Sequence, residues 1–149
     1  MAKGPLTARY AEFVPVFADQ KRTAAQKAGL RYEAAVLKRL DLLYEKVEKG
    51  PWIYYSTGGR GHICQPDGLV WLRPDLICVV EVKLTWVKGA REKLLKFYGP
   101  IVGALHPRVD LCFLQAYKNP KKGCHKRTIS LYELETMQPG SYKESHALL

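Results

Sequence analysis

Apolar side chains recur every three or four residues in the segment that follows residue 22. Glu33 lies one helical turn before Leu37, on the same side of the expected helix as the apolar residues, so we expect its carboxylate to point toward a sheet. The alternative is a solvated glutamate at the edge of the stripe. The pattern predicts a long helix over roughly 22–48, ended by Gly50 and Pro51, whose buried stripe consists of Val36, Leu37, Leu40, Leu43, Tyr44 and Val47.

Five segments have the composition or the alternation of β-strands. A helix over 88–105, disturbed at Gly99 and Pro100, separates the third strand from the fourth and supplies a crossover. The resulting order, α-β-β-β-α-β-β, predicts an α/β fold in which a mixed central β-sheet is flanked by helices. We expect the strands at 52–57, 67–72, 77–84, 109–116 and 127–134.

The two ends of the chain carry weaker patterns. Pro5 and Pro15 interrupt any helix in residues 1–20, where we expect an N-terminal arm or a short helix. For residues 138–149 we expect a flexible tail. A length of 149 residues with 47% apolar content suits a single domain over 1–149.

The third expected strand carries charge on one of its faces. Side chains alternate along a strand, so Glu81 and Lys83 share a face with Ile77 and Val79, while the opposite face is wholly apolar. Burying a carboxylate and an ammonium side by side is costly unless they have a use. The alternative is a salt bridge at a strand end, with Asp67 in an ordinary turn.

Asp67 precedes Glu81 by fourteen residues, and the pair can supply the carboxylates through which Mg²⁺ binds. The backbone carbonyl of Val82 can complete the same shell. Lys83 would orient or deprotonate a water molecule, or neutralise charge that grows on a phosphate. This combination predicts a nuclease that hydrolyses a phosphodiester by in-line attack of water, with Mn²⁺ as a substitute for Mg²⁺.

Pro66, Asp67, Glu81 and Lys83 together resemble the motif of the PD-(D/E)xK phosphodiesterase superfamily. This superfamily includes restriction endonucleases, RecB-type nucleases and archaeal-type Holliday junction resolvases. The resemblance implies a restriction-endonuclease-like core and an acid on the preceding helix, a position that Glu33 occupies. It further implies that the three acids hold the metal and position water, and that Lys83 is the catalytic lysine.

Within the superfamily, the chain is most similar to the archaeal-type resolvases. The spacing of the helix acid, Pro-Asp and Glu-x-Lys resembles theirs, and Ser56 is placed like an additional active-site serine in those enzymes. The resemblance implies a homodimeric DNA endonuclease that cuts opposed strands of a four-way junction in recombination and repair. A face of the second helix would then contribute to a dimer surface or, in a monomer, to the core, through Leu94, Leu95, Tyr98, Ile101 and Val102.

Two other functions remain open for this pattern. A RecB-like DNA exonuclease is one, although its Gln-x-x-x-Tyr motif lacks the glutamine because Leu94 stands four residues before Tyr98. The other is a catalytically silent DNA-binding module that retains the fold.

Lys and Arg number 24 against 14 Asp and Glu, and the net charge of +10 favours a polyanionic partner. The basic residues gather in three runs, each of which could instead be a solvated face. The glycine-rich loop 57–62 could bring Arg60 against a phosphate, or it could be a plain hairpin connection. We expect contacts with DNA from Lys21, Arg22, Lys27, Arg31, Arg60, Lys88, Arg91, Lys118, Lys121, Lys122, Lys126 and Arg127.

The four cysteines form no Cys-x-x-Cys pair, so their spacing predicts neither a zinc site nor a disulfide framework. We expect Cys78 and Cys112 to be buried thiols. We expect no signal peptide, and the sequence contains no apolar stretch of eighteen residues. We therefore expect a soluble protein, without a membrane partner, in the reducing cytoplasm of a bacterial, archaeal or phage-infected cell.

Overall fold

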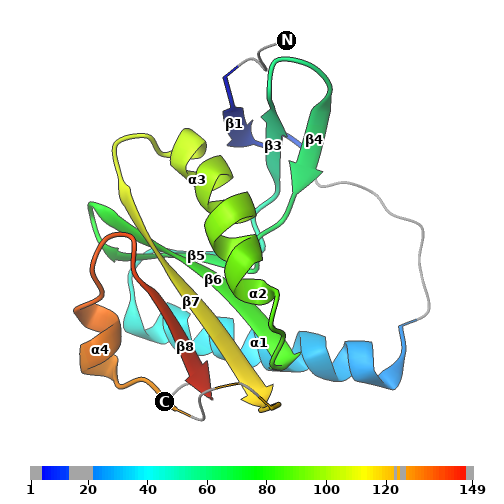
Figure 1. Cartoon of the computed structure of the whole chain (residues 1–149), viewed down its shortest axis with the longest axis vertical. Helices are drawn as coiled ribbons and strands as arrows, with labels where there is room; N and C mark the ends of the chain where they lie inside the picture. The colour runs from blue at the N-terminus through cyan, green and yellow to red at the C-terminus, as the bar shows by residue number, and fades with distance from the viewer. Residues whose placement is uncertain (1–4, 14–21, 123, 125–126, 147–149) are drawn as a thin grey trace.

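The computed structural model of the chain describes residues 5–13, 22–122, 124 and 127–146. At its centre is a five-stranded sheet of β2 (Val47–Lys49), β5 (Gly68–Arg73), β6 (Leu76–Thr85), β7 (Asp110–Asn119) and β8 (Tyr142–His146), in this order. One face is covered by α1 (Ala24–Leu43), and the other by α2 (Ala90–Glu92), η1 (Lys93–Tyr98) and α3 (Gly99–Leu105) (Figure 1). This arrangement confirms the predicted α/β class with a mixed sheet flanked by helices.

Strand β6 is the central strand of this sheet. It pairs with β5 in antiparallel orientation and with β7 in parallel orientation. Cys78, Val80 and Val82 pack into the core beneath α1, while Ile77 and Val79 pack against η1 and α3. The predicted strand 77–84 is therefore confirmed, and it is buried on both faces as expected for a strand with a parallel neighbour.

Helix α1 begins at Ala24 because Thr23 and Gln26 form a capping box. The backbone N–H of Gln26 donates to the Thr23 hydroxyl, and the Gln26 side chain accepts from the Thr23 N–H. The helix ends at Leu43, earlier than the predicted residue 48, because the chain becomes extended at Tyr44. Val47, which continues the apolar period of the helix, belongs to β2 instead.

A second, three-stranded sheet packs beside α3 (Figure 1). It contains β1 (Thr7–Tyr10), β3 (Ile53–Ser56) and β4 (Gly61–Cys64), with β3 in the middle. Part of the N-terminal arm expected over 1–20 is thus a strand, while residues 14–20 lie outside the described residues. The expected strand 52–57 lies in this small sheet. Of the loop expected over 57–62, residues 57–60 connect the β3–β4 hairpin, while Gly61 and His62 already pair within β4.

The crossover between β6 and β7 is helical, as predicted, but η1 within it is a π-helix. Pro100 has no N–H to donate to the carbonyl of Lys96, and its ring crowds that turn, so the preceding turn widens. Gly99 lets the helix lie close to β7, because a Cβ atom there would be 3.1 Å from Cζ of Phe113. The face proposed as a possible dimer surface is core, since Leu94, Tyr98, Ile101 and Val102 are buried.

The C-terminal third differs most from the prediction. The expected strand 127–134 is wrong, because Ser130 caps α4 (Leu131–Glu135) by accepting a hydrogen bond from the N–H of Glu133. The last strand is β8, which pairs with β7 in parallel orientation. It lies in the segment 138–149 that was expected to be a flexible tail.

Two leucines on α1 provide a test of this packing. Leu40 is fully buried, whereas Leu42 is 73% exposed. We expect Leu40→Ala to lower the free energy of unfolding by about 2–5 kcal/mol, because it leaves a cavity beneath the sheet. The matched Leu42→Ala should change it by no more than about 0.5 kcal/mol. Urea denaturation measures both, and equal effects would contradict the orientation of α1.

Candidate active site

Asp67 stands where β5 begins, directly after the buried Pro66. Its backbone carbonyl accepts a hydrogen bond of 2.9 Å from the N–H of Gly50. Its carboxylate oxygen Oδ2 accepts a hydrogen bond of 2.7 Å from the N–H of Val82. The pairing of β5 with β6 begins only at Gly68. At residue 67 the side chain, instead of the backbone, accepts a hydrogen bond from β6, so its carboxylate lies beside the C-terminal part of β6.

The backbone N–H of Val82 therefore points toward the Asp67 side chain. A residue in a strand directs its N–H and C=O to the same side, so the carbonyl of Val82 is also on the side of β6 from which Asp67 approaches. This is the orientation expected for a carbonyl that completes a metal shell.

Glu81 is 2% exposed and lies on the face of β6 that η1 covers. Its Oε1 pairs with Nζ of Lys83 at 3.1 Å, so the predicted acid and amine do lie side by side. Its Oε2 is buried and has no hydrogen-bond partner among the described residues. An unpartnered oxygen on a buried carboxylate is costly unless a further positive group approaches it.

Glu33 is half-buried on α1, and its carboxylate interacts with the charges of Glu81 and Lys83. Burial raises the pKa of Glu33 first, the negative charge of Glu81 raises it further, and the ammonium of Lys83 lowers it. Gly68 permits this approach of α1, because a Cβ atom there would lie 2.6 Å from Cδ2 of Leu37, one turn beyond Glu33. The structure thus brings Glu33, Asp67, Glu81 and Lys83 into one neighbourhood.

These acids repel one another in a poorly solvated place. Burial raises the pKa of Asp67 to about 7, and the charges of Glu81 and then Glu33 add to the rise. The hydrogen bond from Val82 and the charge of Lys83 oppose it. In the described part of the chain, no group of three or more His, Cys, Asp or Glu side chains lies close enough together to hold a metal ion. The orphaned Oε2 of Glu81 and the raised pKa of Asp67 nevertheless fit a divalent cation held between these two side chains.

Lys93 and Tyr98 also belong to this neighbourhood. The sequence connects Tyr98 with the site only through the incomplete Gln-x-x-x-Tyr motif, and it did not identify Lys93 as a site residue. Lys93 Nζ lies 3.9 Å from Glu81 Oε1 and 5.2 Å from the centre of the Tyr98 ring. The Tyr98 hydroxyl donates to the carbonyl of Gln65, close to Asp67. A π-helix places residues five apart on one face, which explains why the spacing of Lys93 and Tyr98 gave no signal at a period of 3.6.

Ser56 and Arg60 are not brought to these carboxylates. Both lie at the outer end of the β3–β4 hairpin, which Figure 1 shows at the opposite end of the molecule from the end of β6. The hydroxyl of Ser56 donates to the carbonyl of Gly59 within that hairpin. The hairpin turns this loop away from Asp67, so the structure does not bring Ser56 to the carboxylates, and Arg60 remains an expected DNA contact at a distance from them.

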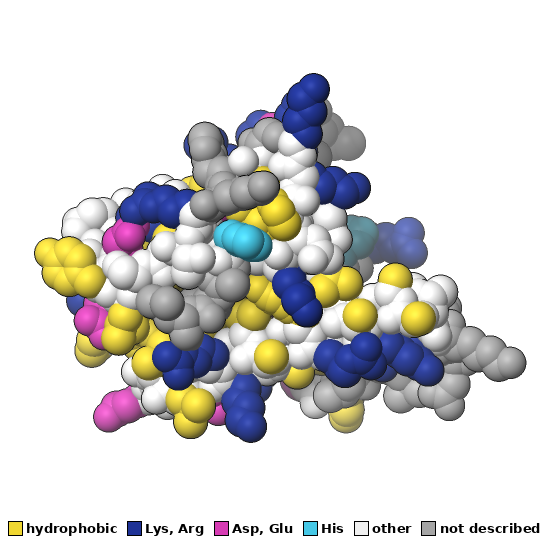
Figure 2. Space-filling model, turned by 90° about the horizontal axis from the view of Figure 1, so that it is seen from below, with side chains coloured by type: hydrophobic (Ala, Val, Ile, Leu, Met, Phe, Trp, Pro, Cys, Tyr) yellow, Lys and Arg dark blue, Asp and Glu magenta, His cyan; other side chains and the backbone are white. Residues whose placement is uncertain are grey.

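The basic residues expected to contact DNA are exposed wherever the structure describes them. Figure 2 shows the side of the molecule that carries α1, where Lys and Arg side chains are spread among hydrophobic ones and acidic side chains are fewer. Lys21 and Lys126 lie outside the described residues. Apart from Arg60, the exposed basic residues that are expected to contact DNA are Arg22, Lys27, Arg31, Lys88, Arg91, Lys118, Lys121, Lys122 and Arg127.

Two of the basic runs meet in a groove of about 340 Å³ beside α1. Arg31 comes from the first run and Lys118 from the last, and Tyr32 and Leu84 line the groove with them. Not every basic side chain is available in this way. Arg127, for example, pairs with Glu133.

The free cysteines Cys78 and Cys112 are buried, as expected. Among the described residues, no helix is long and apolar enough to cross a membrane. No protein-family model matches the chain, and neither a curated protein nor a solved structure matches it.

The raised pKa of Asp67 gives a pH-dependent stability with a defined sign. The folded pKa is about 7, and an unfolded aspartate has a pKa of about 3.9. The folded protein therefore binds more protons than the unfolded chain between these values. The contribution of Asp67 to the free energy of unfolding falls as pH rises from about 4 to about 7.

We expect Asp67→Asn to remove this fall, because the neutral amide can still accept the hydrogen bond from Val82. At pH 8 and in EDTA, the variant should be more stable than the wild type by on the order of 2 kcal/mol. Urea denaturation at pH 5 and pH 8 measures the difference. The exposed Asp75, changed to Asn, is the control. A variant at position 67 that loses stability at pH 8 would refute the account.

Proposed function

We propose that this protein is a Mg²⁺-dependent DNA endonuclease of the PD-(D/E)xK type. The observation that carries the proposal is the meeting of Asp67 and Glu81 at the end of β6, with one buried oxygen of Glu81 left without a partner. Glu33 and Lys83 complete the set of three acids and one amine that the motif implies.

The order of elements supports the same proposal. If the small sheet of β1, β3 and β4 and the short helix α4 between β7 and β8 are set aside, the chain runs α1, β2, β5, β6, the α2–α3 helical segment, β7 and β8. The three strands β2, β5 and β6 form an antiparallel meander, and the helical crossover leads to the parallel strand β7. This is the order α-β-β-β-α-β-β that a restriction-endonuclease-like core would have, although β2 and β8 replace two of the predicted strands.

Each side chain of the set has a distinct task in this chemistry. Asp67 and Glu81, with the carbonyl of Val82, would hold the Mg²⁺ ion, and Glu33, which interacts with the charge of Glu81, would position a water molecule beside it. When bound, the ion supplies positive charge to the phosphate and makes a water molecule a stronger nucleophile. Lys83, whose side chain is 35% exposed, can reach from Glu81 toward solvent and place its ammonium against the charge that develops on the phosphate. Val82 keeps Asp67 oriented through its N–H.

The basic face that includes α1 supports DNA as the substrate, since phosphate contacts need exposed cations without acidic partners. In the described part of the chain, Lys27, Arg31, Lys88 and Lys118 form no ion pair with an acidic side chain. A four-way junction is the substrate form that the motif spacing favours. A homodimer that cuts both strands of a junction would have to use a surface other than the buried face of η1 and α3.

A nuclease assay over several substrate forms tests the proposal. With Mg²⁺, we expect the wild type to place symmetric nicks near the branch of a four-way junction whose strands are labelled. Asp67→Asn should lower this rate by at least about a hundredfold, because it removes a charged metal ligand. Its affinity for the same junction in EDTA should stay within about threefold.

The other outcomes of this assay have clear meanings. Progressive shortening of linear duplex from its ends would indicate an exonuclease of the RecB type. The absence of cleavage of every DNA and RNA form, with both Mg²⁺ and Mn²⁺, would leave only a nucleic-acid-binding module.

Lys93 gives a separate prediction, because it shares the carboxylate of Glu81 with Lys83. We expect Lys93→Met to lower the cleavage rate constant about tenfold, since it removes a positive charge beside the reacting phosphate. Lys96→Met is the matched control on the same helix, because Lys96 pairs with Glu92 and its side chain is 77% exposed. Equal rates for the two variants under single-turnover conditions would exclude Lys93 from the active site.

A further inference from the structure

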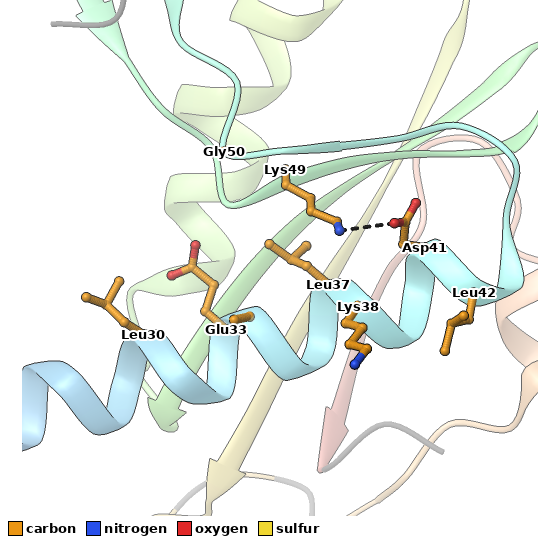
Figure 3. A pocket seen from close by; sticks show the side chains of 9 residues that line it. Leu30, Glu33, Leu37, Lys38, Asp41, Leu42, Lys49 and Gly50 are labelled. Carbon is orange, nitrogen blue, oxygen red and sulfur yellow. Dashed lines mark ion pairs between the residues drawn. The ribbon is translucent and has the colours of Figure 1, made fainter.

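A groove of about 670 Å³ lies beside the candidate site, between α1 and the turn that follows β2 (Figure 3). Two of its lining residues connect it with the site. Glu33 is part of its wall, and Gly50, at its rim, holds the backbone of Asp67. A ligand in this groove would therefore lie next to the candidate carboxylates.

The wall of the groove along α1 is largely apolar. Leu30, Ala34 and Leu37 line it, and Leu30 is 41% exposed. Leu42, farther along the same helix, is 73% exposed. Leu37 is itself buried, so the exposed apolar surface of this wall comes mainly from Leu30 and Leu42, and a ligand with apolar surface would gain free energy by replacing the water on these side chains.

Two lysines accompany this apolar wall. In Figure 3, Lys49 projects from β2 across the groove toward Asp41, and their charged atoms are 3.0 Å apart. Both side chains are nearly half exposed, so the pair is weak and a phosphate can replace the aspartate as the partner of Lys49. Lys38, from α1, is exposed and forms no ion pair with a described acidic side chain.

This combination distinguishes between two kinds of nucleic acid. A duplex presents its phosphates outward and keeps its bases stacked inside, so it needs cations and little apolar surface. An unpaired strand also exposes its bases and sugars, which pack on apolar or aromatic side chains while the phosphates meet cations. An apolar wall with lysines at its margins is complementary to the second.

We infer that this groove binds an unpaired segment of a nucleic-acid strand next to the phosphate that is cleaved, with Lys49 and Lys38 as its phosphate contacts. The inference rests on the proposed nuclease function for its placement. It adds that the preferred substrate carries a single-stranded segment at the cleavage point, as an opened junction or a tailed duplex does.

Fluorescence anisotropy in EDTA tests binding without cleavage. The probes are a single-stranded oligonucleotide, the blunt duplex of the same sequence, and that duplex with a single-stranded tail. We expect Lys49→Met to weaken binding of the single strand and of the tailed duplex about threefold to tenfold. It should also reduce the slope of log K against log salt for the single strand by about 0.7. Binding of the blunt duplex should change less than twofold.

Leu30→Ser separates the apolar contribution from the ionic one. It should weaken binding of the single strand without changing the salt slope, because it removes no charge. Arg108→Met is the control for the loss of a cation, since Arg108 is exposed in the turn before β7, away from the groove. Thermal unfolding of each variant verifies that the fold is retained.

Equal weakening for the blunt duplex and the single strand would overturn the inference, and so would unchanged binding in both variants. These outcomes are independent of catalysis. Variants that bind as expected in a protein that cleaves nothing would refute only the proposed nuclease. A protein that cleaves but binds single strands equally well with Met at position 49 would refute only the role of the groove.

Discussion

Two carboxylates, those of Asp67 and Glu81, occupy the buried end of β6, and their mutual repulsion is the constraint on which this region depends. Neither can be solvated freely, and they have different partners. Asp67 accepts a hydrogen bond from the N–H of Val82, whereas Glu81 forms ion pairs with the ammonium groups of Lys83 and Lys93. One oxygen of Glu81 has no partner, so the arrangement is stabilised only in part without a cation. Burial first, and the charge of Glu81 second, raise the pKa of Asp67 to about 7.

The scaffold around this pair leaves it little freedom. β6 is hydrogen-bonded on both edges and covered on both faces, so Glu81 cannot turn outward without moving the centre of the sheet. Gly68 is the first residue of β5 that pairs with β6. Directly before it, the Asp67 side chain bonds to the N–H of Val82 in place of a further backbone hydrogen bond. Glu33 and Glu81 are therefore positioned by α1 and β6, and Asp67, in the bend directly before β5, by its hydrogen bond with Val82, which favours a fixed geometry for the three acids.

The centre of the sheet and much of the site could be predicted because strong periodic patterns specify them. The alternation in β6 assigned Glu81 and Lys83 to one face, and the period of α1 directed Glu33 inward. Other features left no such signal. Val47 fits the helical period although it lies in β2, and Ser130 and Glu133 form a helix start within a segment that resembles a strand. β8 was missed because it is a polar edge strand in which only Ser145 is buried. Lys93 was missed because its relation to Tyr98 depends on a π-helical turn.

Gly68 carries no charge, yet it leaves open the space that the Leu37 side chain of α1 occupies against the sheet. A methyl group there would lie 2.6 Å from Cδ2 of Leu37, so either this side chain would have to rotate or α1, which also carries Glu33, would have to move. The spacing between Glu33 and the other two acids therefore depends on the packing at a residue that has no reactive group. Pairing a larger residue at position 68 with a smaller one at position 37 would adjust the spacing of the carboxylates without altering any reactive group.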